Sequence, residues 1–459
     1  MGIRLVKVLI MCTLISECIL ARVYKLDEII STALLTSRSV KLIEKEMQKS
    51  DSYIQEVFGG ALPQISTSVN YNHGFKTYSR SSANFGDFVS DSSVSDSLDT
   101  NNIMRSIGNM LSSLNERPGN TASINLSIEQ PVFLQGKISL GVRIAKIHRS
   151  TLNCKLQEEK LKIKGVIIKL FYASLNAQNN LLVAKDFIKF TEEMHRLAVV
   201  KYIIGKTSEL DTLTSGMHLK RAQMEFRKAE SDLRIVYETL MTNAGIYEPV
   251  ISFGVIGDYP PAEYNETLDS TIEHMKRGNF TLNQLKGAQE IEKLKIKLAQ
   301  TAFLPDIFAG LSLGKIAEFN KINEFGNHKW GDEQKLYVGA KWNIYSGSVR
   351  KHKLNQAYIE ENIFMLNKKQ TAENLELATR NAYEKVSISK DQIATATEVM
   401  ALSEKGFSIA KMSYEVGDKT YLDMQNAELE VEKAKQMYYA ALFEFHSALI
   451  DLKLLLGDL

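Results

Sequence analysis

The sequence predicts an α+β fold of mostly long, coiled-coil-like helices, with four β-strands per chain and two tandem structural repeats. Three observations predict it. Only 7 of the 459 residues are proline, landmarks recur at fixed spacings in the two halves, and four short segments alternate apolar and polar side chains. Scarce proline favours uninterrupted helices, and alternation with a period of two is typical of strands that have one apolar face.

The composition limits the class of protein. With 56 basic and 54 acidic residues the formal net charge is +2, which gives no electrostatic basis for binding nucleic acid. Arg4 and Lys7 precede an apolar run over residues 8–15, a pattern typical of a secretory signal peptide and too short for a membrane-spanning helix. We assign residues 1–21 to this signal; an ordinary apolar strand is the alternative. Its removal would leave one cysteine, Cys154, so we expect no intramolecular disulfide.

The two halves of the chain share landmarks at matching spacings. Two dipeptides recur 242 residues later: Leu26-Asp27 as Leu268-Asp269, and Leu62-Pro63 as Leu304-Pro305. Two pairs of glycines are each separated by 40 residues: Gly205 and Gly245, then Gly417 and Gly457. We therefore divide the mature chain into a first repeat over residues 22–245, a linker over 246–267 and a second repeat over 268–459.

The alternating segments are expected to form strands over residues 64–72, 123–129, 307–313 and 336–345, with Pro131 ending the second. They fit either a small sheet on a soluble core or the wall of a membrane barrel. No segment after the signal has eighteen consecutive apolar residues, so a spanning protein would need a closed barrel. Four strands cannot close one, because a small barrel needs about eight. Three copies of the chain would supply twelve strands.

Two aromatic residues and one loop complete the strand region. Trp342 and Tyr345 would belong to an aromatic girdle at the membrane interface. Residues 79–120 are rich in serine, aspartate and asparagine, and predict a solvated loop between the first two strands.

The spans that follow the strands predict long helical hairpins. Residues 137–204 contain no proline, and a helix of this length would extend roughly 100 Å at 1.5 Å per residue. Gly205 and Gly417 are expected to end the long helices, because glycine adopts the left-handed turn conformation readily. The return helices would begin near Asp211 and Asp423, whose carboxylates are favoured at a helix N-terminus.

The residues that could carry chemistry do not form a known catalytic or metal-binding pattern. Gly205-Lys206-Thr207 resembles part of a phosphate-binding loop, but Val200 stands where that loop requires glycine. The histidines are scattered without ligand spacing. We therefore expect no enzyme, no cofactor and no metal site.

Several motifs together resemble the TolC-type outer-membrane efflux protein family. The chain has two tandem halves with a strand hairpin in each. The motif Leu-Pro-x-Ile begins at Leu62 and at Leu304, and the motif Tyr-x-x-Gly begins at Tyr202 and at Tyr414. The similarity of the second Tyr-x-x-Gly motif continues as far as Asp423. The resemblance implies a homotrimer in the outer membrane of a Gram-negative-type cell. It further implies one 12-stranded β-barrel in contact with outer-membrane lipid, a helical tunnel into the periplasm, and docking to a periplasmic adaptor and an inner-membrane pump.

The resemblance also implies roles at the periplasmic tip. It predicts that Asp211 of the first turn faces Lys419 and Tyr414 of the second and holds the channel closed. It places Asp423 in an acidic ring, while Asn426 stands where a second acid is common and Lys419 where arginine is frequent. The tip that serves as gate and docking site would comprise Tyr202, Gly205, Asp211, Tyr414, Gly417, Lys419, Asp423 and Asn426. The alternative is that the aspartates only cap helices and that the lysine is a solvated surface charge.

Two functions are compatible with these features. The first is an export channel, for efflux of small molecules or for type I protein secretion. The second is a periplasmic coiled-coil scaffold or adaptor without a pore. Two matched helical hairpins and amphipathic strands favour the channel.

Overall fold

The computed structural model describes residues 22–73, 120–250, 253–261, 263–319, 329–416 and 418–459. The expected signal peptide, all but the last residue of the expected loop over 79–120, and Gly417 lie outside the described residues. The chain divides into two compact units, and each combines segments from both halves of the sequence. The first comprises residues 1–51, 146–293 and 359–459, and the second residues 52–145 and 294–358.

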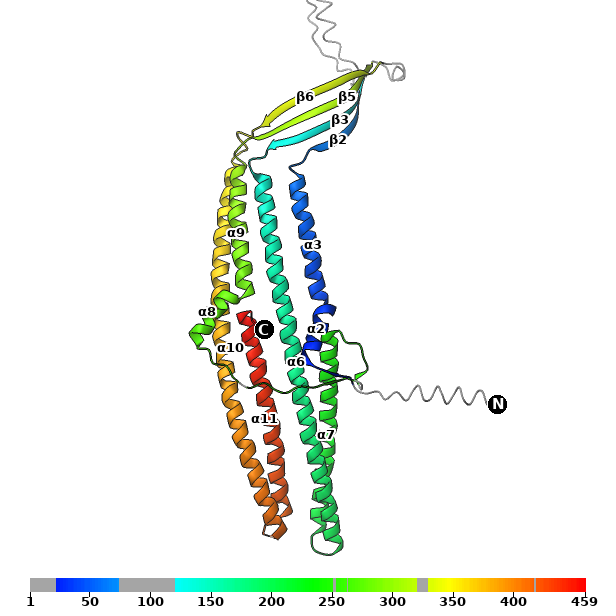
Figure 1. The fold of residues 1–459 in the computed structure, drawn as a ribbon, viewed down its shortest axis with the longest axis vertical. Helices are drawn as coiled ribbons and strands as arrows, with labels where there is room; N and C mark the ends of the chain where they lie inside the picture. The colour runs from blue at the N-terminus through cyan, green and yellow to red at the C-terminus, as the bar shows by residue number, and fades with distance from the viewer. Residues whose placement is uncertain (1–21, 74–119, 251–252, 262, 320–328, 417) are drawn as a thin grey trace, which may run out of the picture. The chain divides into compact units, whose positions relative to one another are not determined.

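Helices make up most of the chain, and long helices form two hairpins (Figure 1). Among the described residues, no helix is both long enough and apolar enough to cross a membrane. The helices are α2 (Leu26–Thr36), α3 (Arg38–Gly59), α6 (Lys137–Ile203), α7 (Glu209–Ala244), α8 (Leu268–Gly278), α9 (Phe280–Thr301), α10 (Val349–Val416) and α11 (Tyr421–Leu456).

The helices repeat as the sequence does. Helices α8 and α9 begin and end 242 residues after α2 and α3, and α11 begins and ends 212 residues after α7. The C-caps of α7 and α11, Gly245 and Gly457, are both left-handed, with φ of 69° and 83°. Matched lengths and matched caps show that the two halves use the same local solution for each helical hairpin.

The core of the first unit lies where the helix pairs meet. One cluster packs Ile29 of α2, Phe171 of α6 and Leu240 of α7 against Phe253. Phe253 belongs to β4 (Phe253–Val255), which pairs in parallel with β1 (Arg22–Tyr24). A second cluster joins α8, α9, α10 and α11 around Phe445. Burying this apolar surface holds together helices that would be marginal alone.

The second unit contains a four-stranded antiparallel sheet in the order β2-β3-β5-β6 (Figure 1). The strands are β2 (Gln64–His73), β3 (Asn120–Phe133), β5 (Asp306–Phe319) and β6 (Gly331–Lys341). Two of them come from each half of the chain, and β3 of the first half pairs with β5 of the second. Within the described residues, β2 and β6 each pair along one edge only.

The ends of two strands differ from the sequence expectation. Strand β3 continues through Pro131, with a register shift between Pro131 and Phe133. The pairing of β3 with β2 stops at Glu129, so β3 has no β2 partner at Pro131. A proline is tolerated there because its missing N–H breaks no hydrogen bond to β2. Strand β6 ends at Lys341, opposite the first residue of β5, so Trp342 and Tyr345 lie beyond the strand.

Candidate functional site

The turn of the first hairpin holds Asp211 as a helix cap. Its Oδ2 atom accepts hydrogen bonds from the Thr207 hydroxyl and, at 3.3 Å, from the Ser208 backbone N–H. The Asp211 N–H in turn donates to Ser208 Oγ at 3.2 Å, which completes a capping box. The Thr207 hydrogen bond is the largest cause that lowers the pKa of Asp211, so the carboxylate is charged at neutral pH.

The turn of the second hairpin repeats this arrangement. Asp423 Oδ2 accepts from the Thr420 hydroxyl at 2.7 Å and from the Thr420 N–H at 3.0 Å. These bonds lower the pKa of Asp423, with a smaller contribution from the charge of Lys419. Both aspartates therefore cap their own helices within one chain, which is the simpler of the two roles that the sequence offers.

Tyr414 of the second hairpin contacts Lys201 of the first, a residue that was not predicted from the sequence. Lys201 Nζ, in the last turn of α6, donates to the Tyr414 hydroxyl at 2.7 Å and lies 4.2 Å from the centre of its ring. In the described part of a single chain, no hydrogen bond or ion pair joins Asp211 to Tyr414 or Lys419. That pairing stays a prediction for assembled copies. The sequence does contain a signal for Lys201: it is a basic residue in the last turn of the first long helix, close to the predicted hairpin turn.

The other predicted residues of the tip are mostly exposed. Tyr202, Lys419 and Asn426 are open to solvent, and Gly205 adopts a left-handed φ of 71°. Away from the tip, Trp342 and Tyr345 are also exposed, and the Trp342 indole donates to the Phe303 carbonyl at 3.1 Å. The exposed side chains of Tyr202, Lys419 and Asn426 are accessible to solvent and to other molecules.

One face of α11 carries a line of buried polar residues, here called the polar line: Gln425, Glu432 and His446. They are 2%, 4% and 2% exposed and are spaced by seven and fourteen residues, so they share one heptad position. In the part of the chain that the structure describes, each has an atom with no hydrogen-bond partner: both amide atoms of Gln425, Glu432 Oε2 and His446 Nε2. Polar groups at a packing position weaken the packing of a helix, because each loses water without a full replacement.

Glu432 is the one acid of the polar line. Burial, followed by the negative charges of Glu225 and Glu428, raises its pKa to about 7. Burial also raises the pKa of Glu428, one turn away. Gln436 donates to Glu432 Oε1 at 3.1 Å, which satisfies half of the carboxylate.

His446 anchors the linker that joins the two halves. Its ring lies 5.3 Å from Tyr259 and 5.0 Å from Tyr172, and it hydrogen-bonds to the carbonyl of Pro260. The Tyr259 hydroxyl donates to the backbone carbonyl of Tyr172 at 2.8 Å. Burial lowers the pKa of His446 below its usual 6.5.

We expect His446→Phe to reduce the loss of stability in mild acid. Just below its ordinary pKa of 6.5, His446 binds a proton in the unfolded chain but not in the folded chain. The free energy of unfolding therefore decreases as the pH is lowered. Thermal unfolding measured between about pH 7 and about pH 5 should show a smaller decrease for the variant. His148→Phe, which alters an exposed histidine of α6, serves as the control. Equal decreases for His446→Phe and the native chain would contradict the prediction.

The sheet has one apolar and one polar face. In register, Val69 lies beside Ile124, Leu126 beside Leu313, and Leu311 beside Leu336. The exposure of these side chains ranges from partial for Leu311 and Leu313 to 84% for Leu336 on the edge strand. The opposite face carries Ser66 and Ser127, whose hydroxyls are 2.8 Å apart, with other polar and charged side chains.

Helix α7 also exposes an apolar stripe near the first turn. Leu210, Leu213, Met217 and Met224 follow spacings of three, four and seven residues and are all more than half exposed. Heptad spacing is typical of a helix that packs against another helix. An apolar stripe left open in one chain indicates an interaction surface.

The described residues contain no group of three or more His, Cys, Asp or Glu side chains that could hold a metal ion. Asp211, Asp423 and Glu432 are each accounted for by capping or by burial.

Comparison with known proteins agrees with this geometry. Residues 272–458 match the family described as outer membrane efflux protein. The cobalt-zinc-cadmium resistance protein CzcC of Cupriavidus metallidurans is 21% identical over 340 residues, which cover 73% of this chain and 77% of that protein. Two solved structures share the fold. The CmeC outer membrane channel of Campylobacter jejuni has a TM-score of 0.71 at 15% identity, covering 94% of this chain and 85% of that one. The outer membrane protein VceC of Vibrio cholerae has a TM-score of 0.71 at 13% identity, covering 94% and 96%.

Proposed function

We propose that this chain, whose residues 272–458 match the outer membrane efflux protein family, is a TolC-type member of that family and that three copies of it form an export duct. In this proposal the sheets of three chains close one 12-stranded barrel, and the helical hairpins form a tunnel on the periplasmic side. The tip docks to a periplasmic adaptor and an inner-membrane pump.

The observation that carries the proposal is the amphipathic sheet with its two open edges. Among the described residues, no strand pairs with the outer edge of β2 over residues 64–72 or with the outer edge of β6, and the apolar side of the sheet is partly exposed. An isolated sheet of this kind is an aggregation hazard. Pairing β6 of one copy with β2 of the next would satisfy both edges, place the apolar face against lipid and enclose the polar face.

The apolar stripe of α7 supports the same assembly. Leu210, Met217 and Met224 would pack against a helix of the neighbouring copy. Helix α10 exposes a matching series at Leu402, Ile409 and Val416, each seven residues apart. Heptad-spaced side chains on two helices can interdigitate as knobs and holes.

Electron microscopy of the detergent-extracted chain tests the assembly. Elongated particles with threefold symmetry and a rod on the order of 100 Å are expected. Monomers or dimers without a barrel would favour the scaffold role instead.

Channel recordings in planar bilayers test the gate. We propose that charge on Asp211, together with Tyr414, helps to hold the tip closed, so Asp211→Ala combined with Tyr414→Phe should raise single-channel conductance. Asp211→Asn separates this role from capping, because an amide oxygen still accepts from Ser208 but carries no charge. Raised conductance in Asp211→Asn supports a charge-dependent gate. Unchanged conductance in both variants would leave Asp211 as a cap only.

A further inference from the structure

Glu432 of the polar line is buried beside cations that pair with other acids. Lys433 pairs with Glu430 at 2.7 Å, and Lys435 pairs with Glu404 at 3.5 Å. Glu432 itself is 4% exposed, and among the described residues its Oε2 atom accepts no hydrogen bond. An ionised carboxylate that is buried without an ion pair is costly, so the packed form of the chain favours the protonated acid.

The acids that face this part of α11 from other helices lie on the first hairpin, α6 and α7. The charge of Glu225 in α7 acts on Glu432, and that of Asp186 in α6 acts on Glu428, one turn before Glu432. The bases that face the two glutamates lie on the second hairpin, α10 and α11: Lys411, Lys433 and Lys435. Negative charge on Glu432 would therefore repel the first hairpin, so its ionisation acts on the contact between the two hairpins.

Water reaches Glu432 only if α11 moves away from the helices that cover it. Glu432 lies eleven residues after Tyr421, the first residue of α11, which is about 17 Å along the helix. Gln425 lies one heptad closer to the turn and is 2% exposed, and in the described part of the chain neither of its amide atoms is hydrogen-bonded. The side chain of Gln425 therefore supplies no hydrogen bond that would resist a movement of this end of α11.

We propose that Glu432 is a pH-sensitive switch: with its proton α11 packs against the first hairpin, and without it α11 separates from that hairpin and loosens the tip of the duct. The loosening of the duct rests on the proposed function, whereas the separation of the helices does not. Burial raises the pKa of Glu432 to about 7, so the change falls near neutral pH. The packed form binds the proton, so a higher pH favours separation.

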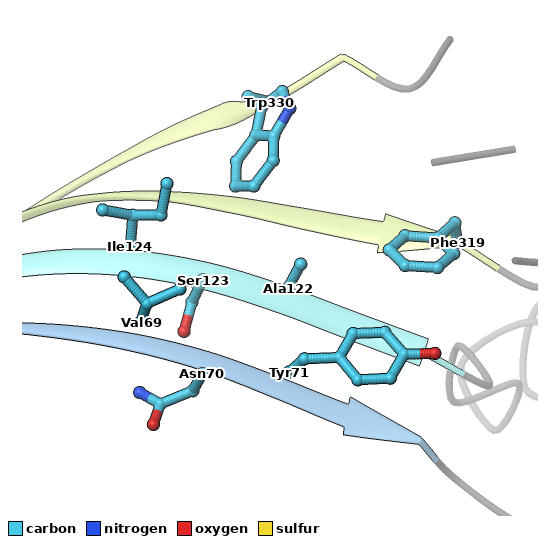
Figure 2. A pocket seen from close by; sticks show the side chains of 8 residues that line it. All are labelled: Val69, Asn70, Tyr71, Ala122, Ser123, Ile124, Phe319 and Trp330. Atoms are coloured by element: carbon cyan, nitrogen blue, oxygen red, sulfur yellow. The ribbon is translucent and has the colours of Figure 1, made fainter. Parts of the chain in front are cut away.

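Hydrogen–deuterium exchange of the full-length chain in detergent tests the separation. Peptides over residues 424–436 are compared at about pH 6 and about pH 8.5, after correction for the pH dependence of chemical exchange. Exchange through separation should increase about tenfold, because the pKa is near the ordinary 4.5 when Glu432 is hydrated and about 7 when it is packed. Peptides of β3 over residues 122–128 are the internal reference. They include three residues that line the pocket in Figure 2, whose lining contains no Asp, Glu or His, and they should exchange equally at both pH values.

Glu432→Gln keeps the shape of the protonated acid and carries no charge at either pH. Its α11 peptides should exchange at the same corrected rate at both pH values. Glu430→Gln, which removes an exposed acid two residues away, is the matched control and should keep the native increase. The comparison of two pH values in the native chain needs no substitution, so it decides the matter even if Glu432→Gln does not fold.

Single-channel recordings at the same two pH values test the effect on the duct. The open fraction should rise at the higher pH in the native chain and in Glu430→Gln, but not in Glu432→Gln. Equal exchange at both pH values in the native chain, or a native increase in Glu432→Gln, would overturn this inference and leave the proposed function standing. A change in exchange without a change in open fraction would overturn the effect on the duct. Absence of any conductance would overturn the proposed function, and the exchange rates would still decide whether the helices separate.

Discussion

Gly278→Ala should destabilise the protein by about 3 kcal/mol, because the new methyl group would meet main chain rather than a movable side chain. A Cβ atom at Gly278, the last residue of α8, would clash with the backbone oxygen of Leu456. The two helix ends are also joined by Asn279, whose amide donates to the Leu455 carbonyl at 2.9 Å. The clashing oxygen belongs to the main chain, so relieving the clash requires the ends of α8 and α11 to move apart.

Gly406→Ala is the matched control for this prediction. Gly406 lies inside α10, where, within one chain and apart from the helix itself, a Cβ atom would meet no described atom within 4 Å. Alanine in an open helical position should stabilise by about 0.5–1 kcal/mol. Thermal unfolding in detergent, followed by helical circular dichroism, measures both. A Gly278→Ala midpoint equal to that of the native chain would show that the two helix ends are not in backbone contact.

Glu432→Leu should raise stability above about pH 7 and flatten the dependence of stability on pH. The folded chain holds a proton on Glu432 up to its pKa of about 7, whereas the unfolded chain loses it near the ordinary value of 4.5. The unfolded state therefore binds fewer protons in this window, and the free energy of unfolding falls as pH rises through it. The decrease should be about 2 kcal/mol per chain, since one pKa unit corresponds to about 1.4 kcal/mol and relaxation reduces the full shift.

Glu430→Leu provides the control for Glu432→Leu. Glu430 lies two residues away on the exposed side of α11, where it forms an ion pair with Lys433 at 2.7 Å. An exposed pair contributes about 0–1 kcal/mol, so this change should leave the pH dependence intact. If both variants show the native pH dependence, Glu432 is not a buried acid in the assembled protein.

The sequence predicts the helices and strands well, because both depend on local rules. Proline-free spans, glycine turns and alternating side chains locate α6, α10 and all four strands of the sheet. The strand ends are less predictable because they depend on partners. Pro131 is tolerated because β3 is not paired with β2 at that position. Strand β6 ends at the residue that pairs with the first residue of β5.

The candidate site is only partly predictable for the same reason. The capping roles of Asp211 and Asp423 follow from residues within four positions. Lys201 and Tyr414 are more than two hundred residues apart in sequence, so only the packing of the hairpins brings them together. The polar line of α11 does appear in the sequence as Gln425, Glu432 and His446 at heptad spacing, but its burial depends on helices from other parts of the chain.

The pairing of β3 with β5 has a consequence for how the chain acquires its structure. Strand β3 ends at Phe133, and its partner β5 begins at Asp306, so the hairpin of the first half must wait for most of the remaining chain. Contacts between segments so distant in sequence form slowly, and an amphipathic hairpin left open in the meantime is prone to wrong association. We therefore expect either half to aggregate when it is expressed alone, because each would lack the strand that pairs with its hairpin.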